Sequence, residues 1–451
     1  MDAVTLALAK KYTNTALETS MIAKIYGVQW GKGSDPTLTR IRDSAGMTAA
    51  VGIGSAFAAN DFDNAQIYRE IGEVRDTLGN VFIRIPKFYI RKTDGVGYKT
   101  WEVSKFQYPG FYLPWCFWDF ANSKELPYID VGKYKASKSG DNKLRSIANV
   151  FPLRKDTIVN FRTYAQNNGV GYQQLDIHVV DVLRTLMFIE FATLNIQTVM
   201  QGYTAGQYNA THTATVAENA VNRVIVANAI ADLYQVGQPI SIGTSLGGDQ
   251  IATDRIITSI SVYDASNKAI NFDGVAVNIA VGNIVYNSVW KNGFSSGIAA
   301  SSGSLVSNSN GLYPYKYRGI ESPFGDMWQF VDGVNINERQ AWVAKNAADY
   351  ASNVFASPYE QLSYVNAAAN GYVKAIGYDP DRPYIELATD VTGGSTTYYS
   401  DYYYQDVGQR IALFGGSWGG GAYAGISCWY LSDASSIATL NLGGRLLRKA
   451  L

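Results

Sequence analysis

The alternation of apolar and polar positions predicts strands in the first half of the chain. Ile25–Trp30 and residues 81–90 are rich in β-branched and aromatic side chains, in the alternating order that is typical of half-buried strands. Residues 111–120 are dense in aromatic rings around Pro114, which indicates either core packing or a surface on which a sugar stacks. We interpret residues 25–203 as the first part of one main domain.

One segment of this domain has the period of a helix. The segment is residues 176–200. Apolar residues follow a 4-3-4-3 spacing along it, starting one residue earlier: Leu175, Val179, Val182, Leu186 and Ile189. This spacing predicts a helix with one buried stripe. Glu190 lies in the same apolar stretch, and a buried carboxylate needs partners, so we expect it to be hydrogen-bonded in the core.

The N-terminus has a different pattern. Val4, Leu8 and Leu17 can share one helical face, and a lone helix of this length is marginal in water. We interpret residues 1–24 as a helical attachment or oligomerisation segment that packs on the body of the chain or on neighbouring copies. An ordinary first helix of the domain explains the pattern equally well.

Residues 204–310 interrupt the main domain. Short apolar runs alternate there with turn signals such as Gly247-Gly248 and Asp273-Gly274. This pattern predicts an inserted small all-β module with linkers, its centre at about residues 220–292. The main domain then resumes over residues 311–451.

Charge and composition exclude several classes of partner. The formal net charge is zero, so there is no broad basic field, and we expect no nucleic-acid partner. The N-terminus lacks a basic region followed by an apolar run, so we expect no signal peptide. The densest apolar stretch, residues 183–199, contains charged residues and is too polar to span a bilayer, so no membrane insertion is expected. Cys116 and Cys428 lie far apart in sequence, which favours two buried, unpaired thiols.

The sequence carries no motif that identifies an enzyme. It contains neither the Gly-x-Ser-x-Gly nucleophile turn nor a phosphate-binding loop that ends in Gly-Lys-Ser/Thr. His178 and His212 have no nucleophile pattern beside them, and two cysteines with two histidines leave little material for a zinc site. We therefore predict no catalytic residue, metal or cofactor, and a chain that is not an enzyme. A pair of glycosidase carboxylates stays open, because Asp and Glu pairs are common in a chain of this size.

The C-terminal stretch has the composition of a binding surface. Eight tyrosines and two tryptophans lie between residues 384 and 441, where Arg410 is the only basic residue. Tyrosine offers a large amphipathic contact area at low entropy cost, and glycine and serine add adaptable contacts. Strand alternation turns about half of residues 398–404 outward. We predict that Tyr402 and Tyr403 belong to this surface and that Trp418 lies in the core.

Several segments resemble phage tail proteins, namely residues 1–12, 25–30, 85–89, 169–202, 317–335 and 413–447. The last two are similar to the C-type-lectin fold in its phage form, which is shared with diversity-generating-retroelement variable proteins and with the formylglycine-generating enzyme group. The resemblance implies an α+β class: a C-type-lectin-like fold that carries the inserted all-β module and the N-terminal helical segment.

The resemblance also implies a display face. The mutable positions of the variable proteins match residues 419–433, which would place eight residues in solvent: Gly419, Gly420, Tyr423, Ser427, Trp429, Tyr430, Ser432 and Asp433. The scaffold behind them would include Trp418, Gly425, Gly443 and Arg445. The calcium-binding tripeptides of animal lectins and the C-terminal cysteine pair of the enzymes are absent from this sequence, so neither activity is carried over.

The function that the resemblance implies is attachment of a phage to its host. The chain would be a tail-fibre or receptor-binding protein of the virion that binds a host cell-surface glycan or protein. It would contact other virion tail or fibre proteins, form a homotrimer, and be made in the host cytoplasm and released on lysis. The alternative is a structural head-fibre, collar or baseplate protein, and a third hypothesis is a surface polysaccharide hydrolase.

Overall fold

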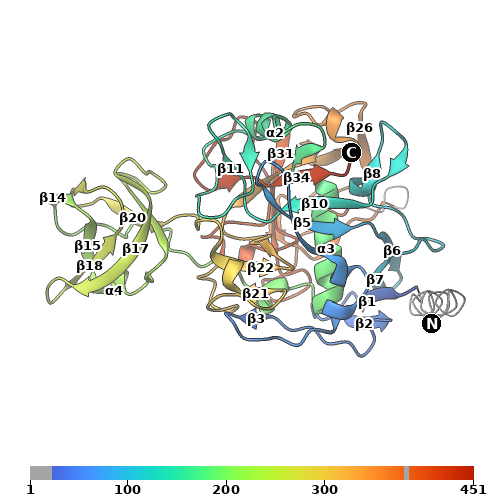
Figure 1. Cartoon of the computed structure of the whole chain (residues 1–451), viewed down its shortest axis with the longest axis horizontal. Coiled ribbons are helices and arrows are strands. Elements are labelled where there is room, and N and C mark those ends of the chain that lie inside the picture. The colour runs from blue at the N-terminus through green and yellow to red at the C-terminus, as the bar shows by residue number, and fades with distance from the viewer. Residues whose placement is uncertain (1–22, 380–384) are drawn as a thin grey trace, which may run out of the picture.

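The computed structural model describes residues 23–379 and 385–451, which form a mostly β protein (Figure 1). Strands hold 36% of these residues and helices of all kinds hold 12%, with three α-helices in the described part of the chain. The predicted α+β class with a C-type-lectin-like fold is therefore wrong. Composition explains the difference, because β-branched and aromatic residues between frequent glycine turns favour short strands. The predicted N-terminal segment, residues 1–24, lies outside the described residues except for Ala23 and Lys24.

Three larger sheets build the main body. The first has the order β2 (Thr39–Arg42), β1 (Ile25–Trp30), β7 (Tyr98–Ser104), β6 (Tyr89–Gly95). The second has the order β13 (Tyr172–Gln174), β34 (Leu446–Lys449), β10 (Tyr128–Gly132), β5 (Val81–Pro86), β4 (Gly72–Arg75). The third, which we call the eight-stranded sheet, has the order β26 (Tyr359–Val365), β25 (Gln340–Ala344), β24 (Trp328–Asn337), β31 (Gln409–Phe414), β32 (Trp429–Leu431), β30 (Tyr402–Gln405), β27 (Asn370–Tyr372), with β33 (Leu442–Gly443) beside β24.

Smaller elements complete the body. One four-stranded sheet consists of β23 (Ile320–Glu321), β22 (Tyr315–Tyr317), β21 (Gly303–Ser304) and β3 (Gly52–Ile53). Three two-stranded sheets pair β8 (Trp118–Asp119) with β9 (Lys124–Glu125), β11 (Ser137–Lys138) with β12 (Leu144–Arg145), and β28 (Ala375–Ile376) with β29 (Ala388–Asp390). The strand predicted at Ile25–Trp30 is confirmed. The strand predicted at residues 81–90 divides into β5 and β6, because Pro86 has no N–H for the sheet and Lys87 donates to Pro127 outside it.

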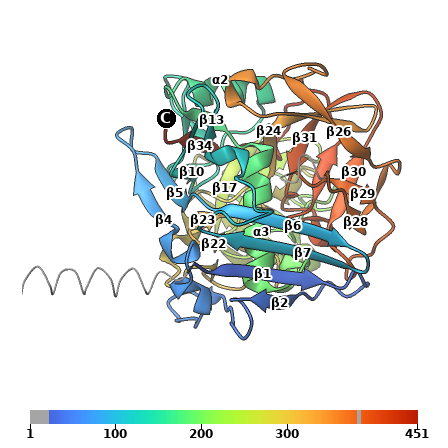
Figure 2. The ribbon, with the colours of Figure 1, turned by 90° about the vertical axis from the view of Figure 1, so that its right-hand side faces the viewer.

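Helix α3 (Ile177–Phe191) lies at the centre of the main body, between β7 and β24 (Figure 2). Asp176 caps its first turn by accepting the N–H of Val179, and Ala192 ends it in the left-handed conformation, well before the predicted end at residue 200. All of its residues are buried, so the predicted single buried stripe is wrong: the main body surrounds the helix. A shorter helix, α2 (Ile158–Gln166), packs near β13.

Buried polar groups of the helix are paired across the core. Glu190 accepts hydrogen bonds from Arg318 at 2.7 Å and from Asn60 at 2.8 Å, which confirms the prediction that this carboxylate is satisfied in the core. Cys116 and Cys428 are both buried and unpaired, as predicted.

Residues within the predicted insertion form a separate sheet. Its order is β15 (Arg223–Ala227), β18 (Asn267–Phe272), β17 (Ala252–Val262), β16 (Pro239–Gly243), β20 (Ile284–Asn287), with α4 (Asn228–Ala231) and the pair β14 (Glu218–Val221) and β19 (Val277–Ile279) beside it. Val224, Ile240 and Ile270 belong to an apolar core that is distinct from the core of the main body. This module projects from one side of the body (Figure 1).

Candidate functional site

Two strand pairings bring tyrosines side by side at the edge of the eight-stranded sheet. β30 is antiparallel to β27, which places Tyr402 opposite Tyr372, and parallel to β32, which places Tyr404 beside Tyr430. Because side chains alternate along a strand, Tyr402 and Tyr404 lie on the same face. Tyr423, at the end of a short 3-10 turn (Gly421–Tyr423), lies against Tyr402.

The rings continue into one row, which we call the aromatic ribbon: Trp328, Tyr372, Tyr402, Tyr404, Tyr423 and Tyr430. The ring centroids are 5.6 Å apart for Trp328 and Tyr430, 5.0 Å for Tyr430 and Tyr404, and 4.5 Å for Tyr404 and Tyr402. The centroid of Tyr402 lies 5.0 Å from Tyr372 and 4.6 Å from Tyr423. Aromatic pairs attract at such distances, so the rings hold one another in place. Every ring is at least partly exposed, and Tyr423 is exposed by 44%.

A hollow of about 280 Å³ borders the ribbon at its Trp328 end. Its lining adds polar groups to the rings of Trp328 and Tyr430, namely those of Asp433, Thr439 and Asn441. Burial raises the pKa of Asp433 above its ordinary value, and the nearby Arg410 opposes that shift. Flat ring faces beside hydroxyl, amide and carboxyl groups suit a ligand that has both apolar faces and many hydroxyls, which is the chemistry of a sugar.

The same hollow lacks the two carboxyl groups that glycoside hydrolysis uses. Asp433 is the one carboxylate among the described residues of its lining. Retaining and inverting glycosidases both need a pair, separated by roughly 5–9.5 Å. The arrangement therefore suits binding of a sugar better than its cleavage.

The ten predicted site residues fall into groups. Those in the aromatic ribbon are Tyr402, Tyr423 and Tyr430. Four lie in the neighbouring loops and are partly or fully exposed: Gly419, Gly420, Ser432 and Asp433. Of these, Asp433 lines the hollow. Those that are buried are Tyr403, Ser427 and Trp429.

The predicted exposure of the last three residues is wrong. Tyr403 and Trp429 are exposed by 2% and 1%, because they lie beside each other on the inner face of β30 and β32. Trp429 packs against Phe414, with ring centroids 5.2 Å apart. Ser427 is buried as well, and its N–H donates to Asp401 at 2.7 Å.

Sequence reasoning missed three members of the ribbon. Tyr404 could have been found, because it follows Tyr402 by two residues and therefore shares its face. Trp328 and Tyr372 belong to β24 and β27, far from β30 along the chain. Only the pairing of the strands brings these two rings to the ribbon, and the local sequence does not predict that pairing.

The residues that were predicted to form the scaffold lie in the interior. The four predicted scaffold residues, Trp418, Gly425, Gly443 and Arg445, are all buried. The Arg445 side chain donates to four backbone carbonyls and to Gln329, which ties β34 to the loops around it. A Cβ atom at Gly425 would lie 2.0 Å from Oδ1 of Asp401, so only glycine leaves room for that carboxyl group.

Asp401 directly precedes β30, and its titration gives a test of this packing. Burial raises its pKa well above the ordinary value, so the folded state holds a proton that the unfolded state releases. The contribution of protonated Asp401 to the free energy of unfolding should therefore be fully present below about pH 3.9, the pKa of an unfolded Asp. It should be lost as the pH rises above that value.

We expect Asp401→Asn to remove this decline, because the amide oxygen still accepts from Ser427 and carries no charge. Urea unfolding at pH 4 and pH 7 should show that the variant gains stability relative to the unmodified chain at the higher pH, by up to about 1.4 kcal/mol for each pH unit between the two pKa values. An equal difference at both pH values would contradict the expectation.

The described residues hold no group of three or more His, Cys, Asp and Glu side chains placed to bind a metal ion. No helix in the same part of the chain is long and apolar enough to cross a membrane. Comparison of the sequence with protein-family models and with curated proteins finds no match.

Proposed function

We propose that this chain attaches a phage virion to its host by binding a surface glycan along the aromatic ribbon. The observation that carries the proposal is the ribbon itself: six partly exposed rings in contact, with a polar hollow at one end. Charges are scarce along it, so recognition would depend on ring faces and hydrogen bonds rather than on ion pairs.

The phage assignment rests on the resemblance of residues 317–335 and 413–447 to phage tail proteins. Each of these segments contributes a ring to the ribbon, Trp328 from the first and Tyr430 from the second. The homotrimer and the contacts with other virion proteins that the resemblance implies belong to the same proposal.

The ribbon predicts a specific loss of glycan binding. The full chain should bind members of an array of bacterial surface polysaccharides, and the double variant Tyr402→Ala, Tyr423→Ala should bind the same glycans roughly 5- to 140-fold more weakly. Each lost ring removes about 0.5–1.5 kcal/mol of contact energy, and 1.4 kcal/mol corresponds to a factor of ten in affinity. Affinity is measured by biolayer interferometry on the glycans that the array identifies.

The matched control is Tyr263→Ala. Tyr263 is exposed by 40% and lies in the β module, outside the ribbon, so this variant should bind as the unmodified chain does. The double variant also loses ring contacts within the ribbon, so thermal unfolding should confirm that all three proteins are folded at the temperature of the binding measurement. Unchanged binding by the double variant, or no binding to any polysaccharide, would contradict the role of the ribbon.

The place of the chain in the virion needs a separate observation. Gold-labelled antibodies against this chain should mark the free ends of fibres in electron micrographs of the phage. Labelling confined to joints between virion subunits would support a structural role instead.

A further inference from the structure

A second hollow, of about 480 Å³, is lined in part by residues 374–378, which follow β27. Its charged lining consists of Lys32, Asp94, Lys99 and Lys374. Such a volume is within the roughly 300–1,000 Å³ that is usual for small-molecule sites. The hollow shares no lining residue with the aromatic ribbon or its polar hollow.

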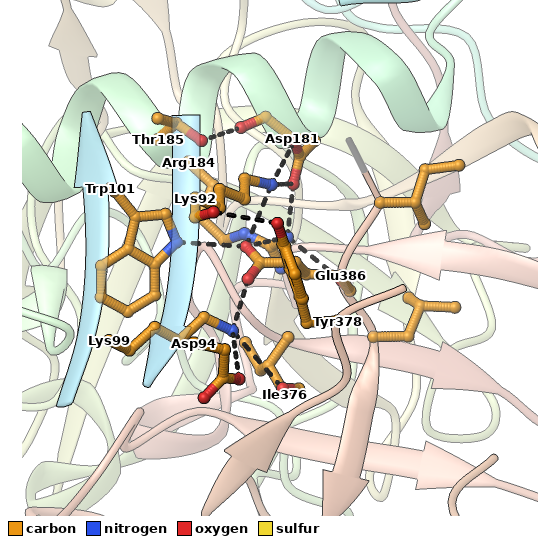
Figure 3. A network of polar contacts seen from close by, with 12 residues as sticks. Lys92, Asp94, Lys99, Trp101, Asp181, Arg184, Thr185, Ile376, Tyr378 and Glu386 are labelled. Carbon is orange, nitrogen blue, oxygen red and sulfur yellow. Dashed lines mark hydrogen bonds and ion pairs between the residues drawn. The ribbon is translucent and has the colours of Figure 1, made fainter. Parts of the chain in front are cut away.

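Beneath this hollow lies a network of buried charges that ties α3 to β6, β7 and the residues before β29 (Figure 3). Lys99 Nζ lies 2.6 Å from Glu386, and Lys92 Nζ lies 3.1 Å from Glu386 and 2.6 Å from Asp181. Arg184 bonds Asp181 at 2.7 Å and approaches Glu386 at 3.4 Å. These side chains are exposed by at most 3%, so water does little to screen them.

The network is not neutral. Lys99 also lies 3.8 Å from Asp94, which pairs with Lys32 at the rim of the hollow. Within the described residues the linked ion pairs thus join four cations, Lys32, Lys92, Lys99 and Arg184, to three carboxylates, Asp94, Asp181 and Glu386. The network therefore has one positive charge in excess. Lys32 and Lys99 are its two cations that line the hollow. Lys374 adds no further charge, because it pairs with Asp390 at 3.3 Å.

The wall of the hollow offers flat rings and one hydroxyl group without a partner. Trp30 packs edge-on against Tyr398 and Tyr399, with ring centroids 6.3 Å and 5.4 Å apart, and all three rings line the hollow. Tyr399 is fully buried, yet its hydroxyl has no hydrogen-bond partner among the described residues. A buried hydroxyl without a partner costs about 1–3 kcal/mol, which a ligand hydroxyl could recover.

We propose that this hollow binds a small ring-shaped carboxylate, of the class of acidic monosaccharides. Its carboxylate meets the excess positive charge of Lys32 and Lys99, its ring packs on Tyr398, and one of its hydroxyls bonds Tyr399. A single negative charge balances the network, whereas a phosphate monoester carries about −1.5 to −2 and would overcompensate it. The site stands on its own residues and does not depend on the aromatic ribbon.

Isothermal titration of the full chain tests the site. D-glucuronate and N-acetylneuraminate are the probes, with D-glucose and inorganic phosphate as comparison arms. We expect at least one carboxylated sugar to bind at least tenfold more tightly than glucose and phosphate, with an affinity that falls as salt is raised. Phosphate binding more tightly than both carboxylates would overturn the ligand class, and the absence of carboxylate binding up to millimolar concentration would overturn the site.

Three variants connect that binding to the residues. Lys32→Gln removes the excess charge at a side chain exposed by 34%, and should weaken binding at least tenfold. Tyr399→Phe removes only the unpartnered hydroxyl, so it should weaken binding while the midpoint of thermal unfolding stays the same or rises. Lys24→Gln, at another lysine paired with an aspartate, is the matched control and should bind normally. Carboxylate binding that neither Lys32→Gln nor Tyr399→Phe weakens would overturn the proposal.

Discussion

Replacing Glu190 by Leu should lower the free energy of unfolding by about 3–5 kcal/mol, because it leaves a buried arginine without its partner. Arg318 is exposed by only 6%, and its Nε and Nη2 atoms each lie 2.7 Å from a carboxylate oxygen of Glu190. Its other charged neighbour is Asp63, 3.2 Å from Nη1 and partly exposed. Urea unfolding at pH 7 measures the loss.

The double variant Glu190→Leu, Arg318→Met separates the cost of an unpaired charge from the cost of lost packing. Replacing both members of a buried ion pair by apolar residues of similar size is often nearly neutral. We therefore expect the double variant to recover most of the stability that the single variant loses. Equal losses in the two variants would show that packing, and not the unpaired charge, determines the effect.

Glu190 also shows which features of the core can be predicted from the sequence and which cannot. Its position in an apolar stretch predicts burial, and burial predicts a partner. The partner itself, Arg318, is 128 residues away, and no local pattern connects the two. The end of α3 is a similar case: the apolar pattern continues to residue 200, but Ala192 takes the left-handed conformation and ends the helix there.

The candidate site likewise contains residues that the local sequence predicts correctly and residues that it does not. Tyr402 and Tyr423 were predicted from local composition and from resemblance, and both lie in the aromatic ribbon. Trp429 was predicted in the same stretch, but it lies inside because β32 pairs with β30 in a register that turns it toward the core. Register depends on contacts between distant segments, so the face that a ring takes could not be predicted from the rings alone.

The overall class was missed for a related reason. One strongly periodic helix and a resemblance in two C-terminal segments favoured α+β, yet most of the described strands are only two to seven residues long. Such strands leave a weak periodic signal, and each becomes stable only beside its neighbour in the sheet.

Glu386→Gln should have an effect as large as Glu190→Leu at neutral pH. Glu386 is fully buried and lies within 3.4 Å of three cations, Lys92, Lys99 and Arg184. Neutralising it leaves four cations with two carboxylates in the part of the network that the structure describes. We expect a loss of about 3–5 kcal/mol in the free energy of unfolding at pH 7, measured with urea. Glu125→Gln, which breaks the surface pair with Lys87, is the matched control and should cost at most about 1 kcal/mol.

The pH dependence of that loss identifies its cause. Burial alone would raise the pKa of Glu386, but Lys92 and Lys99 overcome this and hold the pKa well below its ordinary value. A lowered carboxyl pKa contributes stability that is present above the unfolded value, about 4.3, and that disappears as the pH falls below it. The difference between Glu386→Gln and the unmodified chain should therefore narrow from pH 7 to pH 3, by about 1.4 kcal/mol for each pH unit below 4.3. A difference that stays constant over this range would mean that the variant loses packing and not the attraction between Glu386 and its lysines.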